Sequence, residues 1–202
     1  MSALFVLVAV AAAPEWKQVK SSDGIVVEAR AVEGSRFAEL RATATVAFPP
    51  DALCAGAFGT GKADPKEPSL KSRTVLSESE HERVAYDFIA APVVSDRDYA
   101  VRTARVLEEG GRCRVTVDIA NEFAPPPKAG VVRVEKLRCT WDFEPQSDGK
   151  TKLTYVVWTD PNTPLPAFLV EPSRQAMMIT WVKLILERAG HWRAGPDGGT
   201  TP

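Results

Sequence analysis

"AFLVEPSRQAMMITWVKLILERAG", residues 167–190, breaks the rhythm of the sequence that precedes it. Its apolar residues recur at spacings of three and four and form one stripe: Met178, Trp181, Val182, Ile185 and Ala189. Lys183 and Glu187 lie on the opposite side. This spacing predicts one long amphipathic helix that ends at Gly190, with Pro172 as a point where it can kink.

The sequence before this helix has the patterns of antiparallel β-strands. Apolar and polar residues alternate in residues 25–31 and 39–46, as in strands with one covered and one wet face. Asp23-Gly24 predicts a hairpin turn, and "FPPDALCAGAFG" predicts a short helix near residues 50–58. Further strands with short connections are predicted over 70–78, 82–90, 98–108, 111–121, 130–144 and 150–160.

About nine strands and one long helix predict an α+β fold. A single antiparallel sheet of this size must curl around the helix to bury its apolar face. One helix cannot fill the space that so many curved strands enclose. We therefore expect an internal hydrophobic cavity between the sheet and the C-terminal helix.

The composition predicts one globular domain and argues against nucleic acid as a partner. The 202 residues are 45% hydrophobic and 25% charged, with a net charge of −1. His81 and His191 are the only histidines, and the three cysteines lack the spacing of metal ligands. We expect no metal and no cofactor.

The N-terminal residues predict export. Residues 3–13 form an unbroken apolar run that ends in Ala11-Ala12-Ala13, which suits a signal peptide over residues 1–13 and a periplasmic or secreted protein. The run is too short to span a bilayer as a helix. The alternative is a hydrophobic tail on a cytoplasmic protein, because no Lys or Arg precedes the run. Residues 190–202, rich in Gly and Pro, are expected to form a flexible tail.

Several segments, in order over residues 15–189, resemble the START family, the steroidogenic-acute-regulatory-protein-related lipid transfer domains. They are "SDGIVVEAR", "GSRFAELRATATV", "VAYDFIAAPVVSDRDYAVR", "PPPKAGVVRVEKLRCTWDFEP" and "GKTKLTYVVWTDPNTPLPAFLV". The resemblance implies a helix-grip fold that holds one hydrophobic ligand beneath the C-terminal helix. The chain departs from the family in having no room for the N-terminal helix of many animal members. It also lacks the Trp that often follows the short second helix.

The function implied by this resemblance is to bind, and beyond that to transfer, a sterol, phospholipid or other lipid, with the C-terminal helix as the gate. Transient membrane contact and a monomeric state are expected with it. Two alternatives stay open: a cavity enzyme of the same fold, cyclase-like or lipid-modifying, and a ligand-regulated interaction module. The sequence has no Gly-x-Ser-x-Gly motif, no Gly-rich phosphate loop and no nucleophile with a nearby base. A non-enzymatic role is therefore favoured.

Aromatic positions on the central strands and the helix stripe supply the candidate cavity residues. These are Tyr86, Phe88, Tyr99, Arg102, Tyr155, Trp158, Met178, Trp181 and Ile185. Some family members place an acidic–basic pair in the tunnel, for which Asp87 and Arg102 are the candidates. Asp96-Arg97-Asp98 has two interpretations, as ligand anchors or as residues that cap and brace a loop.

Two cysteines are expected to face each other if the protein is exported. A hairpin between residues 111–121 and 130–144, centred near residue 126, places Cys113 directly opposite Cys139. We then expect a Cys113–Cys139 disulfide and a free Cys54, whereas a cytoplasmic protein would keep all three reduced.

Overall fold

The computed structural model describes residues 14–91 and 94–191, which fold into one antiparallel sheet and two α-helices. The helices are α1 (Pro50–Phe58) and α2 (Ala167–His191), and two short 3₁₀ helices are η1 (Glu109–Gly111) and η2 (Asn121–Phe123). The strands are β1 (Lys17–Ser22), β2 (Ile25–Arg30), β3 (Glu39–Val46), β4 (Leu70–Glu78), β5 (Glu82–Ile89), β6 (Arg97–Leu107), β7 (Cys113–Ile119), β8 (Val132–Arg133), β9 (Lys136–Pro145) and β10 (Thr151–Asp160).

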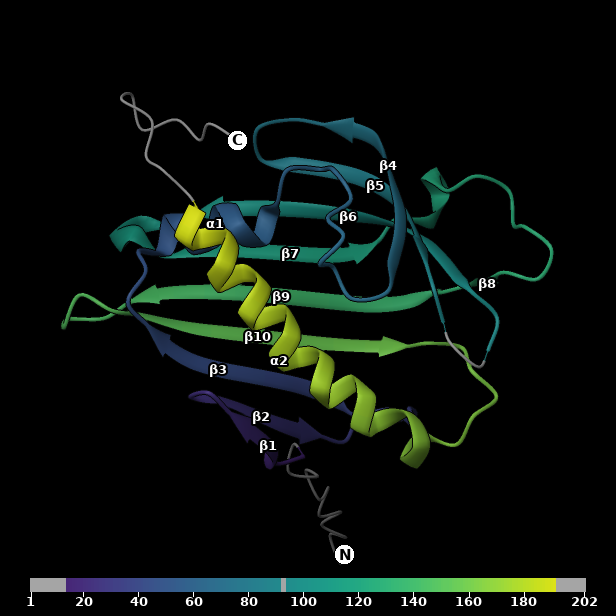
Figure 1. The fold of residues 1–202 in the computed structure, drawn as a ribbon, viewed down its shortest axis with the longest axis horizontal. Coiled ribbons are helices and arrows are strands. Elements are labelled where there is room, and N and C mark those ends of the chain that lie inside the picture. The colour runs from purple at the N-terminus through teal and green to yellow at the C-terminus, as the bar shows by residue number, and fades with distance from the viewer. Residues whose placement is uncertain (1–13, 92–93, 192–202) are drawn as a thin grey trace, which may run out of the picture.

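The sheet is curved, and α2 lies diagonally across one face of it (Figure 1). The strand order is β1-β2-β3-β10-β9-β7-β6-β5-β4, and the short β8 pairs with β6 in parallel. The predicted α+β helix-grip fold is confirmed, with one strand more than expected because residues 130–144 divide into β8 and β9. The predicted signal peptide and residues 192–202 of the predicted tail lie outside the described residues.

Two local predictions are confirmed by the backbone. Asp23 and Gly24 both adopt left-handed conformations, with φ of 54° and 76°, as the tight turn between β1 and β2 requires. The predicted short helix is α1. It packs closely on α2, because a Cβ atom added to Gly56 would lie 3.1 Å from the backbone oxygen of Ile185.

The apolar stripe of α2 forms the centre of the core. The buried residues of this helix are Met178, Ile179, Val182, Leu184, Ile185 and Ala189. All of them except Leu184 belong to one cluster with sheet residues such as Leu40, Leu153 and Phe143, each at most 1% exposed. Burial of a side chain of this size is worth about 1.5–3 kcal/mol, so this contact is a major contribution to stability.

A buried ion pair holds the crossover between β7 and β9 against the outer face of β6. Asp98, which is 1% exposed, accepts hydrogen bonds from Arg133 Nε at 2.6 Å and Nη2 at 2.9 Å. The hydroxyl of Tyr86 donates to the same carboxylate at 2.7 Å. Asn121 adds a bridge, because it accepts from the Ala100 amide and donates to the Val134 carbonyl.

The other aspartate of the Asp96-Arg97-Asp98 triplet also has structural partners. The carboxylate of Asp96 accepts a hydrogen bond from Lys71 Nζ at 2.7 Å and one from the Ala91 amide at 3.2 Å. Both aspartates therefore cap and brace the chain, the second of the two interpretations of this triplet.

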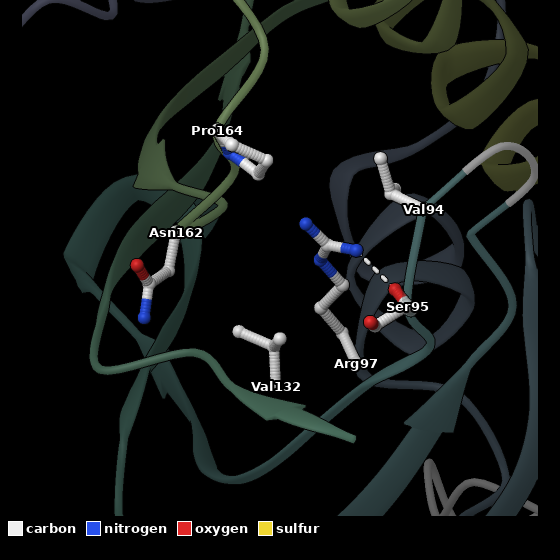
Figure 2. Close-up of a pocket in the computed structure, with 6 residues that line it drawn as sticks. All are labelled: Val94, Ser95, Arg97, Val132, Asn162 and Pro164. Atoms are coloured by element: carbon white, nitrogen blue, oxygen red, sulfur yellow. Dashed lines mark hydrogen bonds between the residues drawn. The ribbon is translucent and has the colours of Figure 1, made fainter. Parts of the chain in front are cut away.

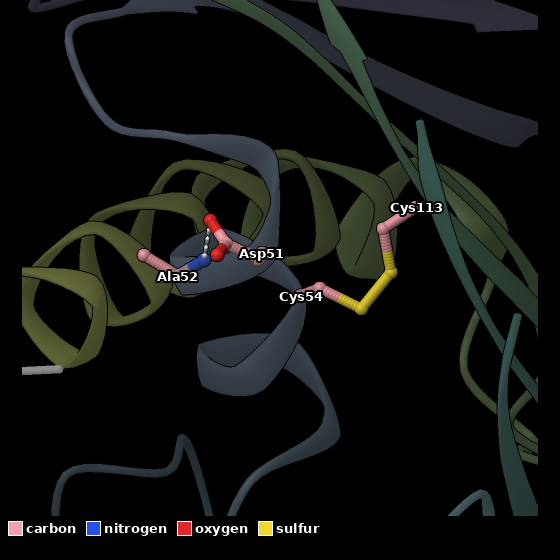
Figure 3. The surroundings of a disulfide bond; sticks show 4 residues. All are labelled: Asp51, Ala52, Cys54 and Cys113. Atoms are coloured by element: carbon pink, nitrogen blue, oxygen red, sulfur yellow. Dashed lines mark hydrogen bonds between the residues drawn. A yellow bond between two sulfur atoms is a disulfide. The ribbon is translucent and has the colours of Figure 1, made fainter. Parts of the chain in front are cut away.

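The disulfide joins Cys54 to Cys113, so the expected Cys113–Cys139 pairing is wrong. Cys54 on α1 and Cys113 on β7 have Cα atoms 6.0 Å apart, within the usual range for a disulfide (Figure 3). Cys139 is free and buried. The prediction failed because β7 and β9 pair in another register, in which Val117 and not Cys113 lies opposite Cys139. The connection between them is no simple hairpin loop, since it contains η2 and β8, which pairs with β6. Cys113 pairs instead with Phe143, four residues beyond Cys139.

We expect Asp98→Asn to lower the free energy of unfolding by about 3 kcal/mol, because it leaves the Arg133 charge half-buried without its carboxylate. The hydrogen bonds from Arg133 hold the pKa of Asp98 below its ordinary value. The stabilisation is therefore fully present above the unfolded pKa of about 4, and it disappears as the pH falls through the lower folded pKa.

Urea unfolding of both proteins over a pH series measures this difference. Asp118→Asn is the control, since Asp118 is exposed and forms no ion pair with the described residues. A difference between wild type and Asp98→Asn that is small at pH 7, or that persists unchanged in strong acid, would contradict the anchor role.

Thiol counting tests the disulfide. Protein made under oxidising conditions and denatured without reductant should expose one reactive thiol, which peptide mapping assigns to Cys139, and Cys139→Ser should expose none. Because the disulfide closes a segment of 59 residues, its reduction should lower the free energy of unfolding by about 2–4 kcal/mol. Two or three thiols, or a mapped bond to Cys139, would disprove this pairing.

Candidate functional site

A cavity of about 620 Å³ lies between the inner face of the sheet and α2. Strands β5, β6, β7, β9 and β10 form its floor, and α2 covers it. Most of its wall is apolar and includes Ala85, Ile89, Val101, Val117, Leu137, Val157, Leu165, Val170 and Met177. This volume is within the usual range for a small-molecule site.

Strand alternation decides which side chains reach the cavity. On β6, Tyr99, Val101 and Thr103 line it, and the residues between them face the outer side. Their partners on β5 follow the same rule, since Asp87 pairs with Tyr99 and Ala85 pairs with Val101.

Five of the nine candidate residues line the cavity, and four do not. Those that line it are Tyr99, Tyr155, Met178, Trp181 and Ile185. Those placed elsewhere are Tyr86, Phe88, Arg102 and Trp158, so their assignment to the cavity is corrected. The error has one cause. Successive side chains of a strand point to opposite faces of the sheet, and each of the four is directly next to a residue that lines the cavity, so it points to the outer face.

The four displaced residues have other contacts. Tyr86 donates to Asp98, and Lys128 Nζ lies 5.8 Å from the centre of the Phe88 ring. The Arg102 side chain is 44% exposed and lies near Glu82. Trp158 Nε1 donates to Ser35 Oγ at 3.3 Å. All four therefore stabilise the outer surface of the sheet.

A stacked pair of aromatic side chains forms part of the cavity wall. The sequence predicts one of them, Tyr155, as a cavity residue, but not the other, Trp141. The rings of Trp141 and Tyr155 lie parallel, with centroids 3.8 Å apart and an interplanar angle of 3°. They are direct partners in the pairing of β9 and β10. A signal was available, since Trp141 alternates with Cys139 and Phe143 and so shares their apolar face.

The cavity also contains a network of buried charges. Asp87, 3% exposed, accepts two hydrogen bonds of 2.7 Å from Arg73. Arg73 also contacts Glu67 at 3.0 Å, and Arg188 on α2 contacts the same glutamate at 2.8 Å. The predicted acid therefore does line the cavity, but its basic partner is Arg73 and not Arg102. The network joins the edge strand β4 to the end of α2.

Burial shifts the pKa values of several cavity groups. Desolvation raises the pKa of Asp87, and the hydrogen bonds and charge of Arg73 offset only part of this effect. Desolvation opposes the charge of Arg73, but its bonds with Asp87 and Glu67 outweigh it, so the pKa of Arg73 is raised. Burial raises the pKa of the Cys139 thiol to about 12, so this thiol stays protonated at neutral pH.

Comparison with known proteins decides the family. Residues 3–194 match the START domain family. The chain belongs to the START family. A protein of Pseudomonas aeruginosa that is described only as uncharacterised is 26% identical over 172 residues, which are 83% of each chain.

Two solved START structures have the same fold. The STAR-related lipid transfer protein of Xanthomonas axonopodis is 22% identical, with a TM-score of 0.75 over 86% of this chain and 98% of that one. Human StAR-related lipid transfer protein 5 is 19% identical, with a TM-score of 0.70 over 87% of this chain and 86% of that one.

In this START domain the cavity reaches the surface at the start of α2. Leu169 lines the cavity and is 56% exposed, and the adjacent Phe168 is 74% exposed. Val94 and Leu165 are further apolar residues of the lining. None of the described helices is long and apolar enough to cross a bilayer.

Proposed function

We propose that this START domain binds one hydrophobic ligand, a sterol, phospholipid or other lipid, in the cavity beneath α2. The apolar wall of a cavity of about 620 Å³ is the observation that carries this proposal. Each Å² of apolar ligand surface removed from water contributes about 25 cal/mol, so affinity would come mainly from burial. The parallel rings of Trp141 and Tyr155 add a flat surface for a ring system or an acyl chain.

The Asp87–Arg73 pair is proposed to meet a polar group of the ligand. Both side chains line the cavity, and the START resemblance implies such a pair in some members. The carboxylate can accept from a hydroxyl and the guanidinium can donate to a carbonyl. One or two such contacts would orient the ligand.

Binding is favoured over catalysis by the chemistry of the lining. Cys139 is the cavity's thiol, and its pKa of about 12 leaves it a poor nucleophile. The side chains of His81 and His191 are 59% and 81% exposed, outside the lining. Within the described residues no cluster of three metal-ligating side chains is present.

Reducing the cavity volume should weaken ligand binding. Thr103→Phe fills space on the inner face of β6 and should reduce the affinity for the neutral probe phenylnaphthylamine at least about tenfold. Ala104→Phe, one position along on the outer face, is the matched control and should bind as wild type does. Fluorescence titration measures both, and native mass spectrometry of protein from its own host shows the co-purifying lipid. Equal binding by both variants would refute the cavity as the site.

We further propose that the start of α2 docks on membranes and that α2 gates the cavity during transfer by a monomer. The exposed Phe168 and Leu169 flank the opening, so insertion of this edge into a bilayer would place the cavity against lipid. Met177 lines the cavity and is 36% exposed, and its flexible side chain suits a moving contact.

Phe168→Ser should weaken binding to phospholipid vesicles about tenfold or more, because burial of a Phe side chain is worth about 1.5–3 kcal/mol. Phe123→Ser is the matched control, since Phe123 is 47% exposed and lies on η2, outside the cavity lining. Vesicle flotation measures both variants. Loss of binding in the control alone would place the membrane contact elsewhere.

We infer that the protein works outside the cytoplasm, in the periplasm or after secretion. The Cys54–Cys113 disulfide supports this, because such bonds persist mainly in oxidising compartments. The apolar run of residues 3–13 supports it independently. The thiol count given above tests the inference when it is made on protein from the native host. Three free thiols there would argue against export.

A further inference from the structure

One of the five arginines that line the cavity has no carboxylate partner in the described part of the chain. Arg73, Arg83, Arg174 and Arg188 each form an ion pair. Arg97 forms none with any carboxylate of residues 14–91 and 94–191. The neighbouring Asp96 contacts Lys71 and the Ala91 amide instead.

The charge of Arg97 is nearly buried. The residue is 6% exposed, and its hydrogen bonds go to two backbone carbonyls, Ser95 through Nη1 and Pro161 through Nε. Nη2 has no hydrogen-bond partner among the residues that the structure describes. Carbonyl oxygens carry no net charge, so they leave the cost of burying a guanidinium only partly offset. Desolvation accordingly lowers the pKa of Arg97, although the group stays charged.

Arg97 also lies between two pockets. It lines the large cavity and a second pocket of about 410 Å³, and Val94 is shared by both. The other residues of this second pocket are Ser95, Val132, Asn162 and Pro164. In Figure 2 the guanidinium extends into the open space between Val94 and Pro164. An anion in this pocket could therefore reach the guanidinium while an attached tail entered the cavity.

We propose that Arg97 binds the anionic headgroup, a carboxylate or a phosphate, of an amphiphile whose apolar tail occupies the cavity. This inference rests on the proposed function and names its ligand class. An anion would supply the missing partner of a buried cation and accept from Nη2. The headgroup would then lie beside the link between β10 and α2, to which Asn162 and Pro164 belong, and the tail would point beneath α2.

Matched lipids that differ only in charge test the proposal. Oleate and oleyl alcohol are compared by their displacement of phenylnaphthylamine. Wild type should bind oleate at least about tenfold more tightly than oleyl alcohol, because a charge-assisted hydrogen bond is stronger than a neutral one. Arg97→Gln should remove this preference, because it should weaken the binding of oleate far more than the binding of oleyl alcohol, and Arg97→Lys should retain part of it. Arg102→Gln removes an exposed arginine outside the cavity and should retain the full preference.

Equal affinity of wild type for oleate and oleyl alcohol would overturn the proposal, and this comparison does not depend on the folding of any variant. A preference that survives in Arg97→Gln would overturn it too. Displacement of oleate by inorganic phosphate at similar concentration would show a site for a free anion and not for a headgroup. If neither lipid binds wild type, the proposed function itself fails, which is a distinguishable result.

Discussion

Met178, Val182 and Ile185 of α2 pack against the middle of the curved sheet, and the rest of the molecule is arranged around this contact. One helix covers only a strip of a sheet this wide. The strands beside that strip therefore have no helix packed on their inner faces. Side chains fill part of that space and leave the cavity. The same helix therefore provides the hydrophobic core along one side and the roof of the cavity along the other.

Two further connections join elements of the scaffold around this cavity. The Cys54–Cys113 disulfide joins α1 to β7, and α1 in turn packs on the end of α2. On the outer face, Asp98 and Arg133 hold the long crossover against β6. Neither connection contacts the cavity, since these residues are outside its lining.

Within the residues that the structure describes, the charged side chains of the cavity divide into those with an oppositely charged partner and one without. The network of Asp87, Arg73 and Glu67 contains its own counter-charges, so it stabilises the fold before any ligand arrives. Arg97 has carbonyl partners alone among residues 14–91 and 94–191, and it lines both pockets. The proposed selectivity for an anionic headgroup would come from this cation, whereas the apolar wall would accept many tails.

The sequence by itself determined the elements: the stripe of α2, the alternating strands, the Asp23-Gly24 turn and α1 could all be predicted, because helix and strand periodicities are local properties of the backbone. The tertiary structure decided the rest. Strand periodicity assigns residues to two faces of the sheet but does not show which face lines the cavity. The sequence therefore predicts Tyr86 and Trp158 in the cavity and does not identify Trp141 as a lining residue. Pairing register was equally undetermined. Cys113 meets Cys54 and not Cys139 because β7 and β9 pair in a register other than the expected one, and contacts between residues far apart in the chain set that register.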